Sequence, residues 1–111
     1  MLNTVTLKKG NLLIPQSVLP ASLIDSTNVL VSYVKEQDSI VIADAHNANF
    51  VGHFPNAQQQ LLKLKNPQGD RVIACHDILL DYRLDAPEGE LSHRRIHKET
   101  ILQIYLNAPQ P

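Results

Sequence analysis

The sequence has one cysteine, no excess of charge and no long apolar run, and each absence narrows the class of protein. Cys75 alone cannot form an internal disulfide, which favours a reducing compartment. A formal net charge of -1 excludes a global positive field, so any binding of nucleic acid needs a local patch of cations. No apolar run approaches the ~18 residues that span a bilayer, and the amino terminus lacks a charged-then-apolar signal. We therefore expect a cytoplasmic protein that does not enter a membrane.

Motifs of several common catalytic sites are also missing. The chain has no glycine-rich phosphate loop, no serine nucleophile elbow and no CxxC or HExxH spacing. Five histidines, at positions 46, 53, 76, 93 and 97, could form a zinc site with Cys75, but no spacing anchors one. Cys75 and His76 are predicted to lie in a strand, where neighbouring side chains point apart, so they cannot act as a pair. We expect no metal and no cofactor.

The composition is that of a globular protein, and its apolar residues alternate as in strands. A chain of 111 residues with 43% hydrophobic and 19% charged residues is expected to form one domain with a single core. Residues 4–8 alternate, residues 28–35 are rich in Val and Tyr, and residues 39–43 return as the second arm of a hairpin. Residues 16–24 have helix-like apolar spacing, and Pro20 is tolerated there only in a first turn. One short helix is therefore predicted near residues 16–24.

Long hairpins are predicted over residues 59–107, after a polar loop over residues 46–58. Residues 61–65 and 71–76 are the arms of the first hairpin. The segment between them, residues 66–70, contains a proline and a glycine, which supply the dihedral angles that a reversal needs.

The strictest alternation in the chain lies over residues 72–84 and predicts one long strand. After a turn over residues 85–90, alternation returns at residues 100–106, which predicts a second long hairpin. Residues 91–99 are compatible with strand, loop or helix. The tail, residues 108–111, is expected to fray.

Together these elements predict a single, mainly β domain over residues 1–111. We expect a small barrel or sandwich of successive hairpins with one short helix near residues 16–24. Long strands in a short chain leave edges that need pairing or charge, and a second copy of the chain can cover them. A homodimer is therefore expected.

The first part of the chain, residues 1–45, has a strand, helix and hairpin in an order that resembles a known family. Its turn is Gly10-Asn11-Leu12-Leu13-Ile14-Pro15, followed by a strand over residues 29–34 and a closing arm over residues 38–42. Over residues 2–43 this pattern resembles the AbrB-like swapped-hairpin family of bacterial transition-state regulators and antitoxins. The resemblance implies an intertwined dimer and a role in transcription regulation.

The same resemblance implies that basic residues of the early strand and turn contact DNA. Lys8 and Lys9 stand at that early position. Two places that are commonly basic in the family hold Asn11 and Leu19 here. DNA contact would therefore depend on few cations in this part of the chain.

Other cations could also form a local patch. Each phosphate that Lys or Arg neutralises releases counterions, so the binding of nucleic acid needs several cations on one face. The densest run, residues 93–98, contains Arg94 and Arg95, and a smaller pair is Lys63 and Lys65. The run favours a solvated edge that prevents aggregation, and a contact for phosphates or a site for a protein partner or acidic ligand are the alternatives.

A second resemblance concerns an enzyme. The segment Asn49-Phe50-Val51-Gly52-His53-Phe54-Pro55 is similar to the F-x-G-H-F-P segment of the hot-dog-fold 3-hydroxyacyl-ACP dehydratases. This implies that His53 is a catalytic base, that Gly52 shapes the turn that binds the carbonyl, and that a long helix follows. Imidazole titrates near neutrality, as such a base requires. However, residues 58–69 contain no Asp or Glu to serve as the acidic partner.

Three functions follow from these observations. The expected one is a non-enzymatic regulatory or interaction protein with an AbrB-like module, which binds DNA weakly or a protein partner through four cations, Lys8, Lys9, Arg94 and Arg95. The alternative is a hot-dog-type protein that binds or dehydrates an acyl thioester with His53. The third is an accessory subunit with neither activity.

Overall fold

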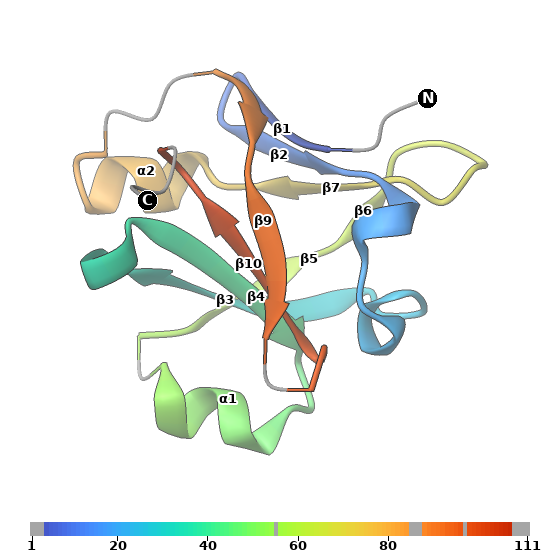
Figure 1. The fold of residues 1–111 in the computed structure, drawn as a ribbon, viewed down its shortest axis with the longest axis horizontal. Coiled ribbons are helices and arrows are strands. Elements are labelled where there is room, and N and C mark those ends of the chain that lie inside the picture. Colours follow the sequence, from blue (N-terminus) through green and yellow to red (C-terminus); the bar gives the residue numbers. More distant parts are fainter. Residues whose placement is uncertain (1–3, 55, 85–87, 97, 108–111) are drawn as a thin grey trace.

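The computed structural model describes residues 4–54, 56–84, 88–96 and 98–107. These residues form two five-stranded antiparallel sheets that pack face to face around one main core (Figure 1). The predicted mainly β fold class is therefore confirmed, and the architecture is that of a sandwich.

The first sheet is built from two hairpins and one added strand. In spatial order its strands are β6 (Lys63–Leu64), β7 (Arg71–Ala74), β2 (Asn11–Ile14), β1 (Val5–Lys8) and β8 (Gly89–Leu91). The β1–β2 hairpin turns through Lys9 and Gly10, which both have positive φ, 52° and 78°. The predicted hairpin over residues 61–76 is confirmed as β6–β7, with Gly69 at φ 95° in its turn.

The second sheet contains the predicted hairpin near residues 28–43. In spatial order its strands are β5 (Gln58–Leu61), β3 (Asn28–Val34), β4 (Ser39–Asp44), β10 (Ile101–Tyr105) and β9 (His93–Ile96). The β3–β4 hairpin turns through a single 3-10 turn, η3 (Lys35–Gln37), and Asp38 follows in the left-handed region. The two arms pair with β5 and β10 of the same chain.

The chain passes from one sheet to the other at both edges of the sandwich. β5 and β6 are consecutive strands on neighbouring edges, with Leu62 between them, and Ser92 occupies the equivalent position between β8 and β9. Within the described residues no ladder of hydrogen bonds joins the two sheets, so they are not closed into a barrel.

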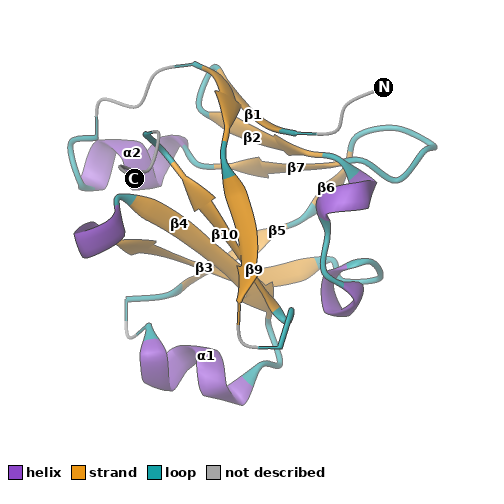
Figure 2. Ribbon diagram, viewed as in Figure 1, coloured by secondary structure: helices purple, strands orange, loops and turns teal. Residues whose placement is uncertain are grey.

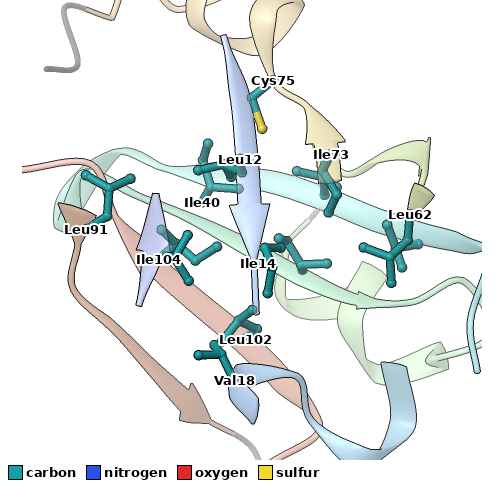
Figure 3. Close-up of a cluster of buried hydrophobic side chains, with 14 of the residues drawn as sticks. Leu12, Ile14, Val18, Ile40, Leu62, Ile73, Cys75, Leu91, Leu102 and Ile104 are labelled. Atoms are coloured by element: carbon teal, nitrogen blue, oxygen red, sulfur yellow. The ribbon is translucent and has the colours of Figure 1, made fainter. Parts of the chain in front are cut away.

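The main core lies between the facing sheets (Figure 3). Alternate residues of each strand point inward, which is why buried apolar side chains recur with a period of two. The first sheet contributes Leu12, Ile14 and Ile73, and the second contributes Ile40 and Ile104, each at most 1% exposed. Full burial of one such side chain contributes about 1.5–3 kcal/mol, so this layer is the main source of stability.

The short helix predicted near residues 16–24 is instead two separate 3-10 turns, η1 (Gln16–Val18) and η2 (Ala21–Leu23). Pro20 separates them because proline lacks an N–H and disfavours helical backbone in the residue before it. Leu19 is accordingly extended, with φ -64° and ψ 131°. The apolar spacing therefore correctly predicts that Val18 and Leu23 are buried and wrongly predicts a continuous helix.

The prediction of a loop over residues 46–58 is wrong, because α1 (Ala48–His53) lies within it. The Asn47 side chain accepts a hydrogen bond of 3.3 Å from the Phe50 N–H and so caps the helix at its start. Figure 2 shows α1 beside the second sheet, on the side away from the first. There Phe50 packs in a smaller cluster with Val41, Ala43 and Ile101.

The prediction of one strand over residues 72–84 is also wrong. β7 ends at Ala74, where its ladder with β2 ends opposite Asn11, and α2 (His76–Asp81) follows. In a single strand, Ile78 and Leu80 would share a face; in the helix Ile78 is buried and Leu80 is 62% exposed. The alternation of apolar residues therefore extends from β7 into α2, a helix that buries only some of its apolar side chains.

The remaining expectations about chain segments are settled only in part. Residues 91–99 include β9, which pairs with β10. The predicted second hairpin, with its turn over residues 85–90, is wrong, because α2 lies before that turn and β8, which follows α2, pairs with β1. The predicted tail, residues 108–111, and His97 lie outside the described residues. None of the helices described is both long and apolar enough to cross a membrane.

Candidate functional site

The strand β9 carries Arg94 and Arg95 at an edge of the second sheet. In the part of the chain that the structure describes, β9 pairs only with β10, which places Arg94 opposite Gln103 and Arg95 opposite Leu102. Leu102 belongs to the main core, so Arg95 lies on the face toward the first sheet and Arg94 on the outer face. Both arginines are exposed, and the edge is therefore basic on both faces.

Arg94 is anchored to the outer face of the second sheet by two contacts. Its Nε donates a hydrogen bond of 2.8 Å to Oε1 of Gln103. Its guanidinium carbon lies 5.8 Å from the ring centroid of Tyr105, within the range of a cation–π contact. The hydrogen bond uses Nε and leaves the two terminal nitrogens to bind a phosphate or carboxylate end-on, as a fork.

Gln103 connects this arginine to the interior. It is 1% exposed, and its Nε2 donates to Oγ of Ser39 at 2.8 Å and to Oε1 of Gln37 at 2.5 Å. Its Oε1 also accepts a hydrogen bond of 3.3 Å from the Tyr105 hydroxyl. We call these five residues, Gln37, Ser39, Arg94, Gln103 and Tyr105, the Gln103 network. Since a buried amide is stable only when its polar atoms are paired, the network holds Gln103, and through it Arg94, in one position.

Arg95 is held on the other face of the strand. Its terminal nitrogen Nη2 donates a hydrogen bond of 3.2 Å to the carbonyl oxygen of Ser17 in η1. The neighbouring His93 is partly buried, and this burial, together with the charge of Arg95, lowers its pKa below the ordinary value. His93 is therefore neutral near pH 7, and the positive charge of β9 comes from its arginines.

The other two predicted cations lie in the first sheet. Lys8 ends β1 and Lys9 begins the turn into β2, and both side chains are exposed. The Lys9 backbone N–H donates to the carboxylate of Glu88, which brings a negative charge to this turn. The structure therefore brings Arg94 and Arg95 together on one strand and leaves the lysine pair in another sheet, beside an acidic residue.

The segment that resembles the dehydratases does not lead into a long helix. α1 ends at His53, and among the residues described beyond position 55 the next regular element is β5, which begins at Gln58. His53 is exposed, and its ring centroid lies 6.4 Å from that of Phe54. A Cβ atom added to Gly52 would meet nothing within 4 Å, so Gly52 does not line a tight carbonyl-binding turn.

Cys75 is not a reactive thiol in the folded protein. Cys75 is buried in the core, and burial raises the pKa of its thiol to about 12. The next residue, His76, is exposed and begins α2, so neither residue lies in the strand predicted for them, because β7 ends at Ala74. In the ranges that the structure describes, no three His, Cys, Asp or Glu side chains are arranged to hold a metal ion.

Two features of the surface were not predicted. One is a polar hollow of about 340 Å³ between η2 and the ends of β3 and β4, whose charged or titratable lining residues are Asp25, Asp44 and His46. The other is the Gln103 network, and a signal for it exists in the sequence. Gln103 is the one polar residue in the run from Ile101 to Leu106, where an alternating pattern places it on the face opposite the core.

No family model, curated protein or solved structure matches this chain. The candidate site is therefore defined by the geometry of β9 and its neighbours.

Proposed function

We propose that the protein is a cytoplasmic, non-enzymatic regulatory or interaction protein that binds the phosphate backbone of DNA weakly through Arg94 and Arg95. The observation that carries the proposal is that both arginines lie on one edge strand, one on each of its faces, and that each guanidinium group is anchored by one hydrogen bond, from Nε of Arg94 to Gln103 and from Nη2 of Arg95 to Ser17. Anchored arginines lose little side-chain entropy when they bind an anion, which favours phosphate contact.

The order of elements near the amino terminus supports a regulatory role. β1, the turn at Gly10, β2 and the β3–β4 hairpin occur in the order that the AbrB-like resemblance implies, with two separate 3-10 turns in the place of its short helix. The cations used differ from those that the resemblance implies, because the carboxylate of Glu88 accepts a hydrogen bond from the Lys9 backbone N–H and so brings a negative charge to the turn of Lys8 and Lys9. The proposal therefore moves the DNA contact from the turn to β9.

Two arginines support only weak and salt-sensitive binding. Each phosphate contact contributes about -0.9 to the slope of log K against log salt concentration, so two contacts predict a slope of about -2. The dissociation constant is expected in the range of non-specific binding, on the order of 10⁻⁴ to 10⁻⁶ M.

The test is fluorescence anisotropy of a labelled duplex at several salt concentrations. We expect Arg94→Gln with Arg95→Gln to abolish the binding and its salt dependence. The matched control, Lys8→Gln with Lys9→Gln, removes the same charge from the other sheet and is expected to bind like the wild-type protein. Absence of binding by the wild-type chain, or equal loss in both double variants, would overturn the proposal.

A further inference from the structure

Within the residues that the structure describes, the first sheet buries one face in the core and leaves the other partly exposed. Core residues of its strands alternate with a row that crosses all five strands on the opposite face. Strand register places the members of this row side by side, in the order Glu90, Thr6, Leu13, Val72 and Lys63. Leu13 and Val72 are only partly buried, and Glu90 and Lys63 are exposed. We call this surface the open face.

No described helix covers the open face. α1 packs on the outer face of the second sheet through Phe50, and α2 contributes Ile78 to the core between the sheets. The open face thus carries two adjacent branched apolar side chains, Leu13 and Val72, in partial contact with solvent. Such a surface is stabilised when another surface covers it.

The charges of the open face are arranged to fit a second copy of the same face. Glu90 stands at one end of the row, Lys63 at the other, and Leu13 at the centre. A two-fold axis that runs parallel to the strands between two open faces places Leu13 against Leu13 and each Glu90 against the Lys63 of the other copy. An axis across the strands would instead place Glu90 against Glu90, which is repulsive.

The next row of the open face is compatible with the same axis. Register places Lys8, Asn11 and Ala74 side by side, and the two-fold rotation brings Lys8 opposite Ala74 of the second copy. No like charges meet in this row. We propose that the protein forms a two-fold symmetric homodimer through the open face, with Glu90 of each copy opposite Lys63 of the other.

The size of the face predicts a weak dimer. Five strands about 4.8 Å apart and two to four residues long give a footprint of roughly 300 Å² per copy. Stable interfaces of standard size bury about 800 Å² per partner. We therefore expect a reversible equilibrium between monomer and dimer that depends on protein concentration and on salt.

Sedimentation velocity from about 5 µM to about 500 µM tests the proposal by charge exchange. Lys63→Glu and Glu90→Lys each place like charges opposite one another and are expected to weaken the dimer about tenfold or more. The double variant restores opposite charges and is expected to restore dimerisation. Lys35→Glu, an exposed lysine of η3 in the second sheet, is the matched control and should dimerise like the wild-type chain.

Each outcome decides for or against the open face. Rescue in the double variant supports it, whereas a wild-type chain that stays monomeric throughout, equal weakening by Lys35→Glu, or a double variant that fails to recover overturns it. Circular dichroism checks that the variants are folded. The open face and β9 belong to different sheets, so loss of the dimer and loss of DNA binding are separate results.

Discussion

Replacement of Gln103 by Leu tests how the buried polar network stabilises the fold. The two side chains have similar volume, so the change removes hydrogen bonds and leaves little cavity. Gln37 and Arg94 are exposed and can turn to water after the substitution, and Tyr105 is partly exposed. Ser39 is 0% exposed, and its hydroxyl would lose the hydrogen bond of 2.8 Å that it accepts from Gln103.

The magnitude follows from this difference in exposure. A buried polar group left without a partner costs about 1–3 kcal/mol, whereas exposed groups that regain water cost much less. We therefore expect Gln103→Leu to lower the free energy of unfolding by about 2 kcal/mol. For a domain of this size that corresponds to a fall in Tm of roughly 8 °C or more.

A double-mutant cycle in urea unfolding isolates the contact. Ser39→Ala removes the hydroxyl that Gln103→Leu leaves unpaired, so the double variant should be more stable than the sum of the single effects predicts, by about 1 kcal/mol. Additive effects, or a Gln103→Leu variant as stable as the wild-type protein, would refute the reasoning.

The Gln103→Leu variant also tests whether Gln103 positions Arg94 for DNA binding. Because Gln103 anchors Arg94, Gln103→Leu should weaken DNA binding even at temperatures where the variant is fully folded. Ser39→Ala leaves the hydrogen bond between Arg94 and Gln103 in place and should bind more tightly than Gln103→Leu. Anisotropy titrations of both variants, with folding checked by circular dichroism, measure this difference.

Two further predictions concern titratable groups. Cys75 is buried and burial raises the pKa of its thiol to about 12, so a disulfide-exchange reagent at pH 8 should label it only at the rate of unfolding; rapid labelling of the folded protein would show that the thiol is accessible. Burial and the charge of Arg95 lower the pKa of His93 in the folded protein. As pH falls below the ordinary histidine pKa, the unfolded chain therefore binds more protons than the folded chain. The stability that neutral His93 contributes above that ordinary pKa should be lost as pH falls through the lowered pKa of the folded protein. His93→Gln should make the free energy of unfolding, measured in urea from pH 5 to pH 8, less dependent on pH; an unchanged pH profile would contradict the assignment.

Local patterns predicted most of the strands and turns. The hairpins at residues 28–43 and 61–76 follow from alternating apolar residues around turn-forming ones, and the structure confirms both. The two α-helices escaped prediction because each is six residues long and its amphipathic signal is short. In α2 the apolar residues also alternate along the sequence, and this period of two predicts a strand where the chain is helical.

The candidate site was predictable only in its parts. Arg94 and Arg95 stood out as a basic run, but their anchors come from η1 and from β10, so which partners meet them depends on how strands and turns pack. Lys8 and Lys9 were equally evident in the sequence, but nothing near them in the sequence indicated that Glu88 would accept a hydrogen bond from the Lys9 N–H.

By itself the sequence determined the mainly β class and several of the places where the chain reverses, because these depend on local apolar periodicity and on the backbone freedom of residues such as Gly10 and Gly69. The tertiary structure alone decided which residues become neighbours. Contacts such as that between Arg94 and Gln103, and rows such as the one from Glu90 to Lys63, join strands that are paired across the fold. Strand order and register set these neighbours, and both result from the packing of the whole domain.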